Sequence, residues 1–246
     1  NLYAVGSRSL KRAQDFSELY GCEKAYGSYE ELASDPAVDV IYIASPHLKH
    51  YPDTLLCLEN GKAVLCEKPV AMNKKQFRVM IDAAQRNNVF LMEALWTRFV
   101  PSFNKFKELV RAGAIGEVKI IESDFCFKAP YTPEGRLFNQ MLGGGSLLDI
   151  GIYPVFMAIT MAGIPDSIKS IAQIGDTNVD ESCTIILHHA KGILSVLYCS
   201  VVTKGPTQTT IYGSEGSIRL NTMWHMPTSI DLMINNKKTK HSFELG

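Results

Sequence analysis

The first third of the chain alternates short apolar runs with longer polar-apolar segments. Apolar, β-branched runs at 2–5, 38–44, 63–66 and 89–93 are typical of strands, and we expect 38–44 to be buried on both faces. Between them, 10–20, 51–60 and 73–87 are predicted helices, and Ser9, Ser28 and Asn73 stand at expected N-cap positions. Strands that alternate with helices form parallel sheets with right-handed crossovers. This part is therefore predicted to be α/β, with a doubly wound parallel sheet.

After residue 95 the pattern changes. Helices are predicted at 102–112 and 146–162, a long strand at 116–128, and then strands at 168–174, 181–189, 192–203, 207–213, 216–220, 229–235 and 238–245. Turn residues such as Lys191-Gly192 and Glu215-Gly216 separate some of these strands. Strands joined by short turns form mainly antiparallel sheets. We therefore predict two domains, 1–95 and 96–246, the second α+β with a large open, mainly antiparallel sheet.

Composition narrows the class of protein. Of 246 residues, 46% are hydrophobic and 20% are charged, and 25 Lys and Arg balance 25 Asp and Glu. No basic stripe favours nucleic acid, and no apolar run approaches the roughly 18 residues of a membrane span, so we expect neither partner. Six scattered cysteines without a C-x-x-C pair are typical of a reducing compartment, so we expect a cytoplasmic protein.

Candidate chemistry stands at the ends of two predicted strands. Glu67-Lys68-Pro69 directly follows strand 63–66, and ligands bind at the carboxyl ends of strands in open parallel sheets. Pro69 has no N–H to continue the strand, so this turn can present the Lys68 ammonium at a cleft. The alternative is a solvated Glu-Lys pair. The loop Ser45-Pro46-x-x-x-His50 follows strand 38–44 in the same way.

These motifs, with Gly143-Gly144-Gly145 and Asp149-x-Gly-x-Tyr153 further on, resemble the glucose–fructose oxidoreductase and inositol dehydrogenase (Gfo/Idh/MocA) family in order and spacing. His47-x-x-His50 and Trp96-Thr-Arg98-Phe99 resemble its dimeric dihydrodiol dehydrogenase branch. The resemblance covers nearly the whole chain and implies a Rossmann domain at 1–95 and a substrate and dimerisation domain at 96–246. It places the family's first strand and glycine-rich phosphate loop before Asn1 and its closing helix and strand after Gly246. We therefore expect the chain to be a fragment.

The resemblance implies an NAD(P)-dependent dehydrogenase or reductase that acts on CH–OH or CH–CH donors. Hydride would pass between nicotinamide and a hydroxyl or carbonyl carbon of a sugar-like or cyclic diol substrate. It implies Tyr153 as general acid/base and Lys68 as its electrostatic partner, which also contacts the nicotinamide ribose. A free tyrosine titrates near ~10, and a neighbouring ammonium stabilises the phenolate.

Two further positions bear on that catalysis. Asp149, one helical turn before Tyr153, is expected to orient the substrate or Lys68; the alternative is a charge favoured by the start of a helix. Many family members carry a His three residues after the Tyr, where this chain has Phe156. The proton-transfer role therefore shifts to Tyr153, and inositol dehydrogenase activity is in doubt.

The cofactor hypothesis depends on Gly6-Ser7-Arg8-Ser9. No acid ends the strand to bind the ribose hydroxyls of NAD, and Arg8 between Ser7 and Ser9 suits a 2′-phosphate, which favours NADP while leaving NAD possible. The alternative is a solvent-exposed turn. The family resemblance also places Ser45, Pro46, His47, His50 and Glu67 beside the cofactor. His47 and His50 lack a third ligand at suggestive spacing, so no metal is expected.

The start of the second domain carries candidate substrate contacts. Trp96, Arg98 and Phe99, with Phe125 and Tyr153, are predicted to line the substrate pocket; the alternative is interdomain packing. The strands of the open sheet would leave an apolar face in a monomer, which favours a homodimer through that sheet, as the resemblance also implies. Two hypotheses of other classes remain: a non-catalytic nucleotide- or sugar-binding sensor, or an inert fragment of the enzyme.

Overall fold

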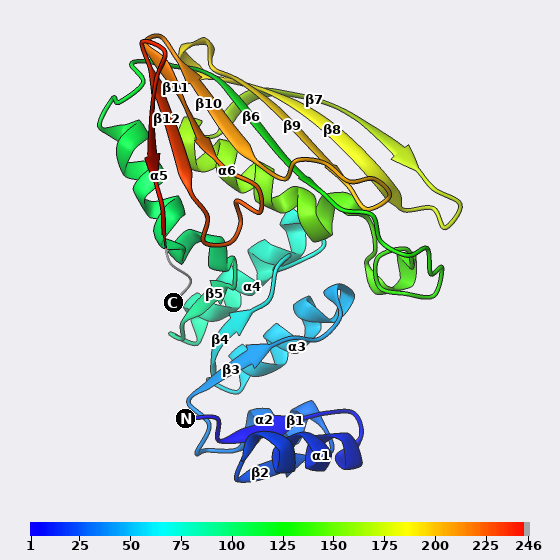
Figure 1. The fold of residues 1–246 in the computed structure, drawn as a ribbon. Helices are drawn as coiled ribbons and strands as arrows, with labels where there is room; N and C mark the ends of the chain where they lie inside the picture. Colours follow the sequence, from blue (N-terminus) through cyan, green and yellow to red (C-terminus); the bar gives the residue numbers. More distant parts are fainter. Residues whose placement is uncertain (244–246) are drawn as a thin grey trace. The chain divides into compact units, whose positions relative to one another are not determined.

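The structure, a computed structural model, describes residues 1–243 and contains two compact units, Asn1–Ala94 and Leu95–Gly246. In the first unit, strands alternate with helices along the chain (Figure 1). Its elements are β1 (Ala4–Gly6), α1 (Leu10–Tyr20), β2 (Lys24–Tyr26), α2 (Tyr29–Ser34), β3 (Val40–Ile43), α3 (His47–Glu59), β4 (Ala63–Cys66), α4 (Lys74–Arg86) and β5 (Leu91–Glu93). β1 pairs in parallel with β2, and β3, β4 and β5 form a second parallel sheet in that order. The predicted parallel α/β architecture is confirmed.

Local capping signals decide where several helices begin. The side chains of Ser9, Ser28 and Asn73 accept main-chain N–H groups in the first turns of α1, α2 and α4, as predicted. The predicted start of the third helix at Tyr51 is wrong, because α3 begins at His47. Pro52 inside α3 removes only one helical hydrogen bond, and burial of the helix face outweighs that loss.

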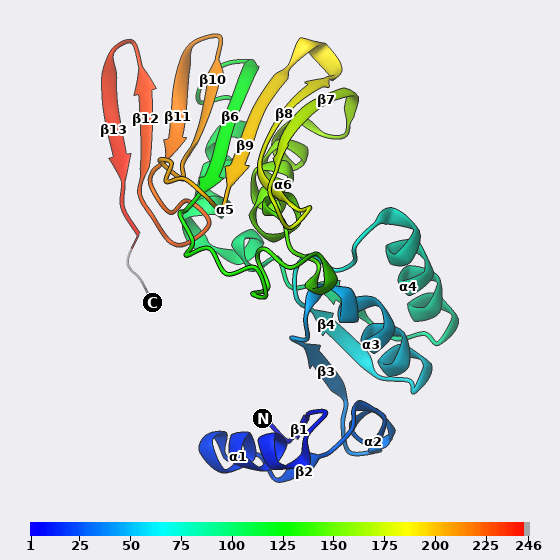
Figure 2. The ribbon, with the colours of Figure 1, turned by 90° about the vertical axis from the view of Figure 1, so that its right-hand side faces the viewer.

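β3 corrects the expectation of a strand buried on both faces. Ile41 and Ile43 are buried, but Val40 is 57% and Tyr42 55% exposed. The helices that follow β3 and β4, α3 and α4, lie together beside the sheet (Figure 2). They bury only one face of β3, so its alternate residues stay accessible.

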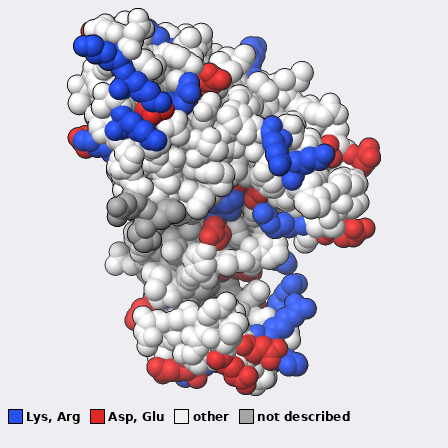
Figure 3. Space-filling model, in the orientation of Figure 1, with Lys and Arg blue, Asp and Glu red and all other residues white. Residues whose placement is uncertain are grey.

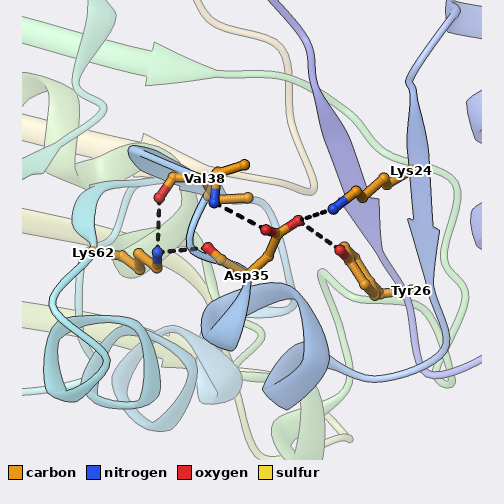
Figure 4. A network of polar contacts seen from close by, with 6 residues as sticks. Lys24, Tyr26, Asp35, Val38 and Lys62 are labelled. Carbon is orange, nitrogen blue, oxygen red and sulfur yellow. Dashed lines mark hydrogen bonds and ion pairs between the residues drawn. The ribbon is translucent and has the colours of Figure 1, made fainter.

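One buried carboxylate connects β2 to the loop that leads into β3 (Figure 4). Asp35 accepts hydrogen bonds from the hydroxyl of Tyr26 (2.6 Å) and the ammonium of Lys24 (2.9 Å). The Lys62 ammonium, just before β4, donates to the main-chain carbonyls of Asp35 (2.6 Å) and Val38 (2.9 Å). These polar contacts therefore join the segments that carry the two parallel sheets.

The second unit is built on one eight-stranded sheet, in the order β13-β12-β11-β10-β6-β9-β8-β7 (Figure 2). Its strands are β6 (Val118–Cys126), β7 (Pro165–Ile174), β8 (Asp180–His189), β9 (Leu194–Ser200), β10 (Thr209–Gly213), β11 (Gly216–Leu220), β12 (Ile230–Ile234) and β13 (Lys237–His241). β6 and β9 pair in parallel and the other neighbours are antiparallel. The predicted mainly antiparallel sheet is confirmed; positions 244 and 245 of its last predicted strand lie outside the described residues.

Helices cover one face of this sheet (Figure 1). They are α5 (Pro101–Arg111) and α6 (Ile152–Ala162), whose Phe103, Phe106 and Met157 pack into a core with Ile121 and Ile211 of the sheet. The other face exposes large apolar side chains on β7, β8 and β9: Ile171, Ile186, Leu194 and Val196. Figure 3 shows an uncharged area over the strands, between separate groups of charged side chains.

The segment Gln140–Ala162 corrects the expectation that no apolar run approaches a membrane span. Its length and mean hydropathy of 1.5 would suffice, although 56% of the apolar window is buried inside the protein. Gly143 and Gly145 adopt positive φ angles of 76° and 119°, so the backbone here is not one continuous helix. α6 within this segment belongs to the core on the covered face of the sheet.

Candidate active site

A contact from β8 determines how the helix that carries Tyr153 begins. The Asp180 carboxylate accepts hydrogen bonds from the Ser146 hydroxyl (2.7 Å) and the Leu147 N–H (2.6 Å). Gly145 is required beside it, because an added Cβ would lie 2.3 Å from Asp180 Oδ1 and φ is 119°. A π-helical turn, Leu147–Gly151, then leads into α6. The helix begins where predicted, but through a wide turn that the sequence did not indicate.

Asp149 lies in this π-helical turn and is buried. Its Oδ1 atom is 2.8 Å from Nη1 of Arg136, whose side chain is largely exposed. The guanidinium offsets part of the cost of burying the carboxylate. Arg136 was not identified from the sequence, since it lies in a loop 13 residues before Asp149. The role of Asp149 towards the substrate or Lys68 stays a prediction.

The Tyr153 phenol lies among aromatic rings. It is 4% exposed, and its oxygen accepts a hydrogen bond from Trp96 Nε1 at 3.3 Å. The ring of Phe125 lies 5.2 Å from that of Tyr153, centroid to centroid. The structure therefore brings together three of the predicted pocket residues. Arg98 and Phe99, in the same short helical turn as Trp96 (Trp96–Phe99), have exposed side chains.

Two members of this aromatic cluster, Trp224 and His225, were missed by the sequence reasoning. His225 stacks on Phe125 (4.3 Å) and lies 5.6 Å from the Tyr153 ring, centroid to centroid. The Trp224 indole N–H donates to the main-chain carbonyl of Asp124 (2.9 Å). Both lie in a loop between β11 and β12, where an adjacent Trp and His were the only available signal.

Phe156, three residues after Tyr153, packs against α5. Its ring stacks on Phe103 of α5, with centroids 5.2 Å apart. Position 156 is thus part of the packing between α6 and α5, and proton transfer by this side chain is impossible.

In the first unit, the Lys68 turn is held by two carboxylates. Glu67 accepts the N–H of Lys68 (3.1 Å) and the hydroxyl of Tyr42, and the Lys68–Pro69 peptide bond is cis. Glu93, at the end of β5, accepts the N–H of Val70 (2.9 Å). Burial raises the pKa of Glu93, while the Val70 N–H and the nearby positive charges oppose that rise. Glu93 was not identified from the sequence.

The segment after β3 lies at the start of α3. Pro46 occupies the N-cap position, and the Ser45 hydroxyl donates to the Asp53 carboxylate (2.6 Å). His47 and His50, predicted in a loop, lie on the first turns of the helix with ring centroids 5.6 Å apart. His50 is buried, and its ring nitrogens are each 2.7 Å from a main-chain oxygen, that of Ser45 and that of Pro69.

The turn after β1 carries the predicted nucleotide contacts. The Ser7 hydroxyl accepts the N–H of Ser9 (3.3 Å), Ser9 caps α1, and Arg8 is exposed. No acid ends β1 at Gly6. Polar and cationic side chains thus follow β1, β3 and β4 at their carboxyl ends, where parallel sheets bind dinucleotides, so the residues present fit such a cofactor.

Some predicted relationships stay predictions. Lys68 belongs to the first unit and Tyr153 to the second, so their pairing stays a hypothesis. Within residues 1–243, no cluster of three or more His, Cys, Asp or Glu side chains is arranged to hold a metal ion.

Comparisons with known proteins agree over most of the chain. Residues 1–95 match the oxidoreductase family with an NAD-binding Rossmann fold, and residues 103–219 match the GFO/IDH/MocA C-terminal domain. The chain is 43% identical over 239 residues to the trans-1,2-dihydrobenzene-1,2-diol dehydrogenase of Xenopus laevis, covering 96% of this chain and 71% of that protein. The enzyme of the same name from Mus musculus is 38% identical over 237 residues, covering 96% and 70%.

Solved structures share the fold. An aldose-aldose oxidoreductase from Caulobacter crescentus superimposes with a TM-score of 0.90 at 24% identity, covering 98% of this chain and 75% of that one. A 3-ketoreductase from Actinomadura kijaniata, in complex with NADP, gives 0.89 at 24% identity, covering 98% and 75%. With the two matched domains and the dehydrogenase relatives, these findings show that the chain belongs to the Gfo/Idh/MocA family of NAD(P)-dependent oxidoreductases.

Proposed function

We propose that the protein oxidises a cyclic diol or sugar-like alcohol, or reduces the corresponding carbonyl compound, with Tyr153 as the general acid/base. The observation that carries the proposal is the buried phenol of Tyr153 with the Trp96 N–H donating to its oxygen at 3.3 Å. Such a donor stabilises the phenolate, the form that accepts a proton from a substrate hydroxyl. When bound, the nicotinamide supplies or accepts the hydride.

The remaining catalytic roles are assigned to Lys68 and Asp149. The Lys68 ammonium stabilises the Tyr153 phenolate electrostatically and binds the nicotinamide ribose. Its turn is supported by the Glu67 carboxylate, which accepts the Lys68 N–H at 3.1 Å. Asp149, paired with Arg136 at 2.8 Å, orients the substrate hydroxyls or the Lys68 side chain. These roles place the proton and the charge on this chain's own residues.

The substrate class follows from the walls around Tyr153. Trp96, Phe125 and His225 present aromatic rings within 6 Å of one another or of Tyr153, centroid to centroid. Flat rings contact the face of a cyclic substrate, while Tyr153 bonds its hydroxyl. The relatives named above are dehydrogenases of a cyclic diol, trans-1,2-dihydrobenzene-1,2-diol. Arg98 and Phe99 complete the substrate pocket.

NADP is the proposed cofactor. Arg8, exposed between Ser7 and Ser9 after β1, is available to bind a 2′-phosphate, and β1 ends without the acid that favours NAD. Ser45, Pro46, His47, Glu67 and Lys68 form the remaining cofactor-binding set, and buried His50 supports it through contacts with the carbonyls of Ser45 and Pro69.

A Tyr153→Phe variant tests the function. We expect at least a hundredfold loss of kcat with a cyclic diol and NADP, because the ring packing survives but the transferable proton is lost. Tyr20→Phe makes the same chemical change on the exposed side of α1 and is the control. Full activity of Tyr153→Phe would refute the acid/base role. A wild-type protein that binds NADP but turns over no diol or sugar would favour the sensor hypothesis instead.

We also propose that the protein forms a homodimer through the exposed face of the eight-stranded sheet. Ile171 is 76% exposed there, and the neighbouring strands β8 and β9 add further apolar side chains. Apolar faces of this kind in soluble proteins mark interaction surfaces.

All six cysteines are free and five are buried, which supports a reducing, cytoplasmic location.

A further inference from the structure

His50 bridges two segments that the proposed function uses. One ring nitrogen, Nδ1, lies 2.7 Å from the carbonyl oxygen of Pro69, directly after Lys68. The other, Nε2, lies 2.7 Å from the carbonyl oxygen of Ser45, directly after β3. The side chain is 1% exposed, so water does not replace either contact. One imidazole therefore joins the carboxyl ends of β3 and β4.

The chemistry of the two partners determines the protonation of the ring. A main-chain carbonyl oxygen only accepts hydrogen bonds. A neutral imidazole has one N–H donor, and its second nitrogen would point a lone pair at a carbonyl lone pair. Only the doubly protonated imidazolium satisfies both contacts, and charge-assisted hydrogen bonds are short, as both distances here are.

The surroundings of His50 fit a cation. Glu93 at the end of β5 interacts electrostatically with His50, and the His47 ring lies 5.6 Å from the His50 ring, centroid to centroid. The other ionisable groups of the joined segments are Asp53 on α3, Cys66 of β4, and Glu67 and Lys68 after β4. Together these groups include three carboxyl groups and one ammonium. His50 and Lys68 both favour the carboxylate form of Glu93, which accepts the N–H of Val70 at 2.9 Å. A buried charge needs such opposite charges nearby.

We propose that His50 is an imidazolium that clamps the Lys68 turn to the end of β3 and so positions the Lys68 ammonium. This role rests on the proposed function of Lys68. His50 is then a positioning residue, which acts on the reaction through Lys68. The charged ring is required because a neutral side chain with one donor satisfies only one of the two carbonyls.

The protonation state is tested without any activity measurement. In protein with ¹⁵N-labelled histidine, ring-nitrogen NMR spectra at pH 7 are assigned by the signal that disappears in His50→Gln. We expect both His50 nitrogens to be protonated. A single protonated nitrogen on His50 overturns the imidazolium. If His50→Gln folds poorly, His50→Asn gives the same assignment.

The positioning role is tested by a double-mutant cycle on kcat/KM with His50→Gln and Lys68→Met. We expect His50→Gln alone to cost on the order of 100-fold, because a displaced catalytic group loses that much. In the Lys68→Met background the same change should cost less than threefold. Lys75→Gln, at an exposed position of α4, should leave kcat/KM unchanged. Equal losses of kcat/KM in both backgrounds would overturn the positioning role of His50. The proposed function is refuted by a different result, an active Tyr153→Phe variant.

Discussion

The indole N–H of Trp96 donates a hydrogen bond to the phenol oxygen of Tyr153 across 3.3 Å. Both residues belong to the second unit, one in a short turn at its start and the other on α6. A donor on that oxygen favours the phenolate over the phenol. Trp96 is therefore a wall of the aromatic cluster and, in the proposed mechanism, the donor that stabilises the Tyr153 phenolate.

Replacing Trp96 by Phe keeps an aromatic ring and removes the donor. Because the phenolate loses stabilisation, Tyr153 should deprotonate at higher pH. The acidic limb of the kcat/KM profile for alcohol oxidation is expected to move up by about one pH unit, the equivalent of one hydrogen bond of ~1.4 kcal/mol. Trp224→Phe is the matched control, since its N–H donates to the Asp124 carbonyl. Trp224→Phe should lower the stability of the protein and leave the pH profile of kcat/KM unchanged. A shift of the same size in both variants would contradict the role assigned to Trp96.

Arg8→Ala tests the choice between NADP and NAD. Loss of a guanidinium bound to a 2′-phosphate removes charge-assisted hydrogen bonds, so the KM for NADP should rise about 10- to 100-fold while that for NAD changes less than twofold. Steady-state kinetics with each cofactor gives both values. Arg78→Ala on α4, which removes only an exposed ion pair with Asp82, should alter neither. Equal increases for both cofactors would refute the assignment.

Asp35 should make the first unit sensitive to acid. The Tyr26 hydroxyl, the Ala37 N–H and the Lys24 ammonium lower the pKa of Asp35 to about 2. This is below the ordinary value of ~3.9, so the carboxylate stabilises the fold above pH 4, and that stabilisation is lost as the pH falls towards 2.

Acid unfolding followed by circular dichroism measures this contribution. Asp35→Asn should be less stable than wild type at pH 6, and the difference should shrink as the pH falls from 4 to 2. Asp15→Asn, which removes the exposed Lys11–Asp15 pair on α1, is the control and should differ little from wild type at either pH. A stability gap for Asp35→Asn that persists unchanged at pH 2 would argue against this account.

A charge on the open face of the sheet should disrupt the proposed homodimer. Ile171→Lys places an ammonium in the apolar patch on β7, so sedimentation velocity is expected to show a monomer where the wild type shows a dimer. Leu19→Lys introduces the same charge at a residue of α1 that is 73% exposed, and should stay dimeric. A wild-type monomer, or an Ile171→Lys dimer, would exclude this interface.

Local signals in the sequence predicted much of the fold. Ser9 and Asn73 satisfy N–H groups within their own helices, so their meaning depends on the next three residues alone. Ordered motifs predicted the family, and they included Trp96 and Tyr153, which the structure brings together. The exposed side of β3 was missed because burial depends on which helices reach each face, and a strand's own pattern does not contain that information.

The missed site residues share one property: their partners are distant in the sequence. Asp180 accepts the N–H of Leu147, 33 residues earlier in the chain, and so holds the start of the Tyr153 helix. His225, in the loop between β11 and β12, stacks on Phe125 of β6. Glu93 binds Val70 across two strand ends. Such contacts follow from the topology of the sheet, and no local spacing predicts them.

The topology also bears on how the second unit is made. β6 lies between β10 and β9, and Ile121 is paired with Ile211 on one side and Ser195 on the other. While the chain is being synthesised, β6 leaves the ribosome long before β9 and β10 are made. Both edges of β6 therefore have no pairing strand during that time. Unpaired strand edges invite association with other chains, and distant pairing slows folding. We therefore expect the yield of folded protein to depend on protection of the nascent chain until β10 emerges.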